Sequence, residues 1–229
     1  MKKNSPFFDT VLFDLDGTLL YTLPDIHLAL DYVLERHGYP LHTISETRTY
    51  VGGGVRRLIE RAIPEGAEDM DEICREYTDY YGRHAQDHIE YYPGIRELVR
   101  ALRTRGVRTG VVTNKPHSAA VPMIQRYFEN EMDITIGKKD EYPAKPSPEC
   151  LWDAMNSLGA SAETTLYVGD APVDAETAAN GGIACALVSW GYSDRPDLEA
   201  CDVLGVFDTP SALLDGIVNL LPEAGADEI

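Results

Sequence analysis

Short apolar runs alternate with amphipathic segments over most of the chain, and this pattern predicts the fold class. Val11, Leu12 and Phe13 form a continuous apolar run, which is typical of a strand buried on both faces of a parallel sheet. From Pro93 onward, strand-like runs alternate with helical patterns; the predicted strands cover 107–113, 132–136, 165–168, 183–188 and 203–206. This alternation predicts an α/β protein with a doubly wound, Rossmann-like parallel sheet.

The stretch from 21 to 91 differs, because it contains helical patterns and no convincing strand. Helices are predicted from about residue 22, over 45–50, over 55–63 and from about residue 70, with glycines or a proline between them. Thr22 is expected to cap the first of these helices with its hydroxyl. We therefore predict a core formed by 1–20 and 92–229 and an all-helical cap, 21–91, inserted after the first strand.

Composition and charge restrict the expected partners. A hydrophobic share of 44% suits a globular protein, and the net charge of −18 argues against nucleic-acid or anionic-membrane partners. No stretch approaches the length of a membrane span, and the four cysteines lack a metal-like spacing, so reduced thiols and a cytoplasmic location are expected. The tail 222–229 is expected to be disordered. An anionic substrate would need local cations or a metal at its site.

Polar side chains follow several of the predicted strands, at the sheet edge where α/β proteins place their reactive groups. The set comprises Asp14, Asp16, Thr113, Asn114, Lys145, Asp170 and Asp174, with Gly17 and Thr18 completing the turn after the first strand. Taken alone, the D-x-D-G at 14–17 is as typical of a solvated Asp-Gly turn as of a reactive site. The other strand ends therefore have to distinguish the two readings.

Together these residues suit phosphoryl transfer. Acids around one point form a site for a hard cation, and Mg²⁺ is favoured because no His or Cys accompanies them. Lys145 and Thr113 could hold phosphoryl oxygens. One carboxylate can attack phosphorus, while a second protonates the leaving oxygen and later activates water. In this hypothesis Asp14 is the nucleophile and Asp16 is the acid/base.

Four short motifs resemble those of the haloacid dehalogenase (HAD) superfamily, and they occur in the same order. They are D-L-D-G-T at 14–18, T-N at 113–114, K-P at 145–146 and G-D-A-P-V-D at 169–174. A helical insert directly after the first motif is similar to the cap of that superfamily. Three further segments, V-G-G-G-V-R-R-L-I-E-R-A, V-V-T-N-K-P and W-G-Y, look most like its phosphoglycolate phosphatase branch.

The resemblance implies a Mg²⁺-dependent phosphatase that acts on a small phosphorylated metabolite through an aspartyl-phosphate. Asp14 would attack phosphorus and Asp16 would protonate the leaving alcohol. The ion would be held by Asp14, the backbone carbonyl of Asp16 and Asp170, with Asp174 orienting the metal shell. The phosphate-binding residues that the resemblance implies are Thr113, Asn114, Lys145 and Gly17.

Substrate contacts from the cap are expected near the break at Gly52–Gly54. Arg56 and Gly53 are the candidates, because an arginine close to a helix start can bind a carboxylate or a second phosphate in a bidentate manner. Lys115, next to the second motif, is a weaker candidate for the same role. The alternative is that the arginines are solvated and that the glycines only mark a helix boundary.

Several functions remain compatible with these residues. A phosphomutase on the same scaffold would return the phosphoryl group to a sugar instead of to water. A receiver-like signalling module gathers similar residues but predicts a shorter chain without a cap, and a non-catalytic relative would only bind phosphate. The sequence leaves open whether the ester is phosphoglycolate, a sugar phosphate, a nucleotide or pyrophosphate, and whether the protein is a monomer or a homodimer.

Overall fold

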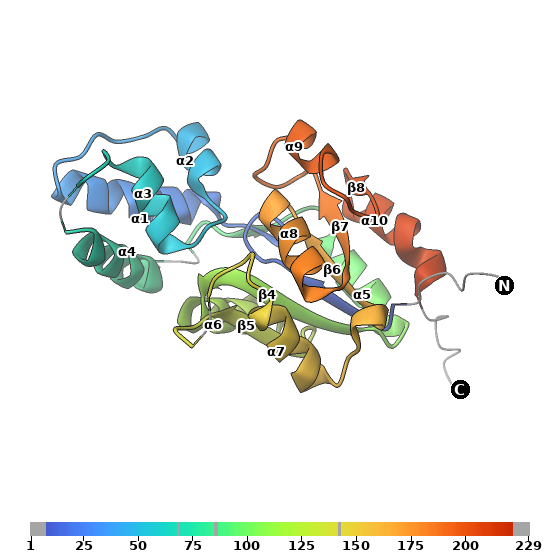
Figure 1. Ribbon diagram of the computed structural model, residues 1–229. Coiled ribbons are helices and arrows are strands. Elements are labelled where there is room, and N and C mark those ends of the chain that lie inside the picture. Colours follow the sequence, from blue (N-terminus) through green and yellow to red (C-terminus); the bar gives the residue numbers. More distant parts are fainter. Residues whose placement is uncertain (1–7, 68, 85–86, 142, 222–229) are drawn as a thin grey trace.

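The computed structural model describes residues 8–67, 69–84, 87–141 and 143–221. Its centre is a six-stranded parallel sheet with the strand order β5-β4-β1-β6-β7-β8 (Figure 1). The strands are β1 (Thr10–Phe13), β4 (Arg108–Pro116), β5 (Ile134–Lys138), β6 (Thr165–Gly169), β7 (Ala184–Val188) and β8 (Val206–Phe207). The predicted doubly wound parallel fold is confirmed. The strand order reverses at β1, which is where such sheets open a crevice at their carboxyl ends.

Helices cover both faces of this sheet. Alternate residues of β1 point to opposite faces, and all of them are buried against these helices. Val11 and Phe13 belong to a buried cluster that includes residues of α5 (Ile95–Thr104), α6 (His117–Phe128) and α10 (Pro210–Ile217). Leu12 belongs to a second cluster, to which α7 (Glu149–Leu158), α8 (Pro172–Gly181) and α9 (Arg195–Glu199) contribute. Burial on both faces explains the continuous apolar run of this strand.

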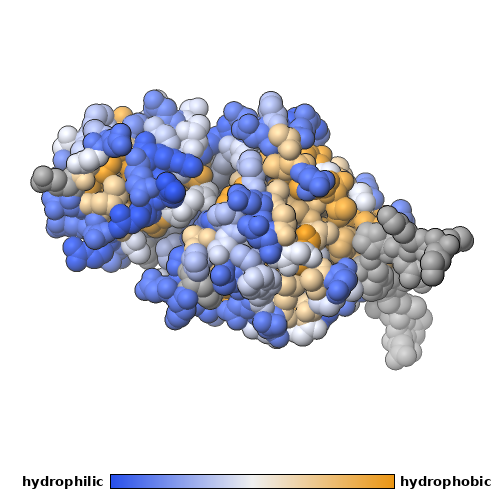
Figure 2. Space-filling model, viewed as in Figure 1, coloured by the Kyte–Doolittle hydropathy of each residue, from blue (hydrophilic) through white to orange (hydrophobic). Residues whose placement is uncertain are grey.

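Four helices, which we call the cap helices, lie together at one end of the molecule, away from the two termini (Figure 1). They are α1 (Leu23–Arg36), α2 (Ile44–Tyr50), α3 (Val55–Ala62) and α4 (Met70–His84). Leu30, Ile59 and Ile73 are fully buried among them. Polar residues cover much of the outer surface of these helices in the space-filling view (Figure 2).

The stretch between 21 and 91 is not free of strand, contrary to the prediction. A two-stranded antiparallel ribbon of β2 (Leu20–Tyr21) and β3 (Glu90–Tyr91) stands where the chain enters and leaves the cap helices. A strand of two residues is too short to show an alternation of apolar and polar positions. These strands are defined only by their pairing across about seventy positions of sequence.

Other boundaries also differ from the predicted ones. The strand predicted over 107–113 continues to Pro116, because Pro116 pairs with Lys138 after an irregularity in the ladder. The last strand is Val206–Phe207 instead of 203–206, α9 was not predicted, and α10 is followed by a short 3₁₀ helix, Val218–Leu220. The tail 222–229 lies outside the described residues.

The helices and cysteines bear on two further expectations. Among the helices that the structure describes, none combines the length and the hydropathy needed to cross a bilayer. All four cysteines are free thiols, of which Cys150 and Cys185 are buried and Cys74 and Cys201 are half-buried. Burial of Cys150 and Cys185 agrees with the expectation of buried thiols, and the reduced state stays a prediction.

Candidate active site

The turn after β1 places two acids at one cavity. The Asp14 amide donates to the Val168 carbonyl at 2.8 Å and so extends the pairing of β1 with β6 by one residue. Asp14 and Asp16 both line a cavity of about 320 Å³, whose walls come from the carboxyl ends of β1, β4 and β6 and from the cap helices α2, α3 and α4. The cap helices therefore cover the cavity into which Asp14 and Asp16 face.

Three buried carboxylates meet around one ammonium group beside this cavity, and two of them, Asp14 and Asp170, line it. Oxygen atoms of Asp14, Asp170 and Asp174 all lie within 4.8 Å of one another. Lys145 Nζ lies 2.6 Å from Asp174 Oδ1 and 3.0 Å from Asp14 Oδ1, and it donates to the Tyr167 hydroxyl at 3.0 Å. One positive charge therefore faces three carboxylates, and the cluster keeps an excess of negative charge.

Burial and the neighbouring charges shift the pKa values of the groups in this cluster. Burial raises the pKa of Asp14 to about 6; Lys145 acts against this shift, and repulsion from Asp174 and Asp16 adds to it. Burial, with repulsion from Asp174 and Asp14, raises the pKa of Asp170 well above its usual range. Burial acts against the charge of Lys145, but the carboxylates of Asp14 and Asp174 raise its pKa.

Asp170 is held in place by its neighbours on both sides. It accepts hydrogen bonds from the Tyr192 amide at 2.7 Å and from the Thr18 hydroxyl at 3.1 Å. A Cβ added at Gly17 or at Gly191 would lie 2.3 Å from Asp170 Oδ2, so only glycine leaves room for this carboxylate. Gly17 also has a φ of +87°, which favours glycine for a second reason.

The donor set fits a hard divalent cation. Only carboxylate oxygens form the cluster, with no His or Cys among its members, and Mg²⁺ prefers oxygen ligands. Asp14 Oδ1 is buried but accepts no hydrogen bond, because Lys145 Nζ lies within ion-pair distance without the alignment of a hydrogen bond. A cation would neutralise the charge that Lys145 leaves uncompensated.

Asp16 has a different set of partners. Its carboxylate accepts hydrogen bonds from the Thr22 hydroxyl at 2.6 Å and from Lys115 Nζ at 2.9 and 3.1 Å. Lys115 Nζ also donates to the Tyr81 hydroxyl of α4 at 2.7 Å. The prediction that Thr22 caps α1 is wrong: Thr22 makes no side-chain cap hydrogen bond, because its hydroxyl is used by the nearby carboxylate, a stronger acceptor.

Thr113 and Asn114 lie inside the extended end of β4 and line the same cavity. The Asn114 side chain donates to the Gly52 carbonyl at 3.0 Å and accepts from the Lys145 amide at 2.7 Å. The Thr113 hydroxyl accepts from the Lys115 amide at 3.2 Å. The side chain of Asn114 therefore joins the loop before α3 to the loop that carries Lys145.

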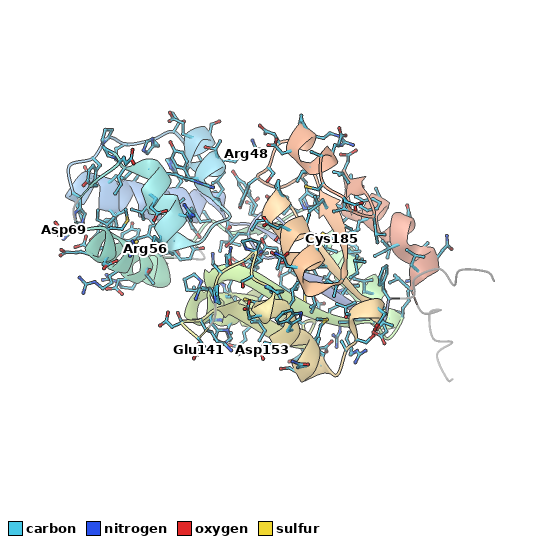
Figure 3. All side chains as sticks on the ribbon, in the orientation of Figure 1. Arg48, Arg56, Asp69, Glu141, Asp153 and Cys185 are labelled. Carbon is cyan, nitrogen blue, oxygen red and sulfur yellow. The ribbon has the colours of Figure 1, made fainter. Side chains whose placement is uncertain are left out.

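Gly52 and Gly54 line the cavity, but the two candidates from this break for substrate contact do not. Arg56 forms an ion pair with Asp71 of α4, its side chain is 57% exposed, and neither Arg56 nor Gly53 is among the described residues that line the cavity. Arg48 lines it instead. As Figure 3 indicates, Arg48 lies at the edge of the cap helices that faces the core, where it pairs with Asp194 at 3.1 Å.

Sequence reasoning missed Arg48 and Tyr81 as cavity residues and Thr22 as a hydrogen-bond partner of Asp16. Tyr81 belongs to the apolar face of α4, and nothing in its local pattern separates it from a packing residue. Tyr192 is a partial exception, since the W-G-Y segment that contains it contributed to the resemblance. Arg48 and Tyr81 make contacts with residues that are distant in sequence, Asp194 and Lys115 respectively.

Comparisons with known proteins place the chain in a family. A family model described as haloacid dehalogenase-like hydrolase matches residues 11–188, which include all four motifs. A phosphoglycolate phosphatase of Pseudomonas syringae pv. syringae (strain B728a) is 31% identical over 220 residues, covering 93% of this chain and 78% of that relative. A phosphoglycolate phosphatase of Cereibacter sphaeroides is 35% identical over 192 residues, covering 81% and 87% respectively.

A solved structure agrees with these relatives. A crystal structure of a protein from Lactobacillus delbrueckii subsp. bulgaricus matches this chain with a TM-score of 0.87 and 28% identity. The match covers 92% of this chain and 98% of the Lactobacillus chain. The resemblance drawn from the four motifs is confirmed, and the predicted phosphatase class agrees with the names of the relatives. The chain therefore belongs to the haloacid dehalogenase-like hydrolase family.

Proposed function

We propose that this protein is a Mg²⁺-dependent phosphatase that hydrolyses phosphoglycolate, or a similarly small phosphorylated metabolite, through an aspartyl-phosphate on Asp14. One observation carries the proposal: Asp14, Asp170 and Asp174 meet Lys145 beside a cavity that Asp14, Asp16 and Asp170 line. The names of relatives at 31% and 35% identity support the choice of substrate. A core of 1–20 and 92–229 with a cap of 21–91 is part of the proposal.

Asp14, Asp170 and the backbone carbonyl of Asp16 would hold Mg²⁺, and Asp174 would orient the groups around it through its ion pair with Lys145. When bound, the ion would neutralise the carboxylates and polarise the phosphoryl oxygens. The shape of the cavity and the cover of the cap helices favour a substrate that is small and partly shielded from water.

In the first half-reaction, an oxygen of the Asp14 carboxylate attacks phosphorus, and the bond between phosphorus and the ester oxygen breaks. Asp16 gives its proton to the leaving alkoxide, which departs as an alcohol. Lys145 holds Asp14 in position and offsets charge on the phosphoryl group, as the Thr113 hydroxyl and the backbone near Gly17 also would.

In the second half-reaction, water attacks the phosphorus of the aspartyl-phosphate. Asp16, now ionised, takes a proton from this water, and the bond between phosphorus and the Asp14 oxygen breaks. Inorganic phosphate leaves and the Asp14 carboxylate is restored. Asp16 acts once as an acid and once as a base, so its protonation state is also restored at the end of the cycle.

Release of inorganic phosphate from a panel of phosphorylated metabolites, with Mg²⁺ and with EDTA, tests the proposal. We expect phosphoglycolate to be among the best substrates, EDTA to abolish turnover, and Asp14→Asn to reduce kcat by roughly 10³-fold or more. Lys139→Met, at an ion pair with Asp153 outside the cavity, is a matched control. Phosphoryl transfer to a sugar without phosphate release, or no turnover of any ester, would contradict the proposal.

A further inference from the structure

Lys115 is a buried cation that the proposed phosphoryl chemistry does not use. Its side chain is only 4% exposed, and its Nζ contacts both carboxylate oxygens of Asp16, at 2.9 and 3.1 Å, and the Tyr81 hydroxyl at 2.7 Å. The Tyr81 ring centroid lies 4.4 Å from the same nitrogen. Lys115 thus stands between the proposed acid/base and a side chain of the cap helix α4.

The charges around the cavity leave few ways to bind a second negative group of a substrate. Among the described residues that line the cavity, the cationic side chains are those of Arg48 and Lys115. Arg48 is engaged with Asp194, whose side chain is 73% exposed, and with the Ser193 carbonyl at 3.2 Å. Lys115 is therefore the buried cation that such a group would meet.

The position of Lys115 beside Asp16 determines which part of a substrate it can meet. Asp16 is proposed to protonate the ester oxygen, so this oxygen must come within hydrogen-bond distance of the Asp16 carboxylate. In a 2-phosphocarboxylate, three covalent bonds separate the ester oxygen from a carboxylate oxygen, a distance of about 3 Å. An ammonium group already bound to Asp16 can reach that carboxylate.

Charge complementarity favours the same arrangement. A substrate carboxylate beside Lys115 Nζ can accept a charge-assisted hydrogen bond from this buried ammonium group. The Tyr81 hydroxyl accepts from Lys115 Nζ, so its own hydrogen is available for the second carboxylate oxygen.

From these contacts we infer that Lys115, assisted by Tyr81, is a specificity-determining residue that binds a carboxylate on the carbon next to the phosphate ester. The inference rests on the proposed function and names the substrate class, 2-phosphocarboxylates, of which phosphoglycolate is the smallest. If Lys115 only oriented Asp16, its loss would slow the hydrolysis of every ester alike. The two roles are distinguished by the ratio of kcat/KM for an ester that carries the carboxylate to kcat/KM for one that lacks it.

The test compares phosphoglycolate with 2-hydroxyethyl phosphate, which has the same length but no carboxylate, using the full chain with Mg²⁺. For Lys115→Met we expect kcat/KM to fall about 100-fold for phosphoglycolate and about tenfold or less for the neutral ester. The preference for phosphoglycolate should therefore drop at least tenfold. Lys115→Arg should keep part of that preference, and Lys139→Met should keep all of it.

Tyr81→Phe provides a second variant in case Lys115→Met does not fold, because it removes the hydroxyl and keeps the ring. The preference for phosphoglycolate should fall several-fold, mainly through a higher KM. Equal losses for the two esters in both variants would overturn the inference and leave the phosphatase proposal intact. The same holds if the unmodified protein hydrolyses the neutral ester as well as phosphoglycolate.

Hydrolysis of neither ester would instead contradict the proposed substrate. In that case, calorimetric titration with glycolate still tests the carboxylate site. Binding by the unmodified protein that is at least tenfold weaker in Lys115→Met supports the inference, whereas equal or absent binding overturns it.

Discussion

Lys145 and Asp174 form a 2.6 Å ion pair between two side chains that are almost completely withdrawn from solvent. The pair joins the loop before α7 to the first turn of α8, and the same ammonium group lies 3.0 Å from Asp14. The contacts that position the proposed nucleophile therefore also hold two segments of the core together.

Replacing Lys145 should affect both activity and stability. Lys145→Met leaves three carboxylates together without their cation, and breaking a buried ion pair in this way costs about 3–5 kcal/mol. We expect a loss of this size in the free energy of unfolding, measured by urea denaturation with EDTA, and a fall in kcat/KM of roughly 10²–10³-fold. Lys139→Met should change the stability by less than about 1 kcal/mol, and an equal effect of the two substitutions would contradict this reasoning.

Asp14→Asn should inactivate the protein yet stabilise its metal-free form. At pH 7.5 the buried Asp14 is ionised at a cost, because burial raises its pKa to about 6, and a neutral asparagine avoids this cost of about 3 kcal/mol. Thermal melts in EDTA should show a Tm several degrees higher in the variant. A lower Tm would show that Asp14 stabilises the fold without a metal.

The stability of the metal-free protein should depend on pH in a defined direction. The pKa of Asp14 is about 6 in the folded protein and 3.8 when exposed, so the folded state binds more protons between these values. The contribution of Asp14 to stability is complete below about pH 4 and is lost as the pH rises through about 6. Unfolding curves measured in EDTA between pH 4 and 7.5 should show this decline, and Asp14→Asn should flatten it. A decline of unchanged size in the variant would assign it to other groups.

Gly191→Ala should weaken metal binding through steric contact alone. The added methyl group would lie 2.3 Å from Asp170 Oδ2 and push this carboxylate from its position. We expect the Mg²⁺ concentration for half-maximal activity to rise about 10–100-fold. Gly82→Ala is the control, since its methyl group meets no atom within 4 Å and should leave the Mg²⁺ requirement unchanged. A similar Mg²⁺ requirement in all three proteins would argue against Asp170 as a ligand.

The ion pair of Arg48 with Asp194 should stabilise the closed position of the cap helices over the core. Arg48→Gln removes a partly exposed pair, so we expect a loss of stability below about 1 kcal/mol and a KM raised by about threefold for phosphoglycolate and for its neutral analogue alike. Kinetic measurements at low and high salt check this, because salt screens the pair in the unmodified protein only. A loss confined to phosphoglycolate would instead make Arg48 the carboxylate ligand.

The approach of the acidic side chains to one another could be predicted, because apolar runs locate the parallel strands that precede these side chains. Apolar runs identified β1, β4 and β6, and the carboxyl ends of neighbouring parallel strands share one edge of the sheet. The residues after these strands were therefore expected to approach one another. The close contacts of Gly17 and Gly191 with Asp170 were not expected, since they depend on a carboxylate far away in sequence.

Local patterns and ordered motifs were enough to predict the parallel α/β core, the helical insert and the family, and to propose a group of acids and a lysine at one edge of the sheet. Three features could be seen only in the folded chain: Arg48 and not Arg56 lines the cavity, Thr22 donates to Asp16, and Tyr81 meets Lys115. Helical periodicity shows which residues share a face of a helix. Which face meets the core depends on how the cap helices pack, and that is set by contacts between distant parts of the chain.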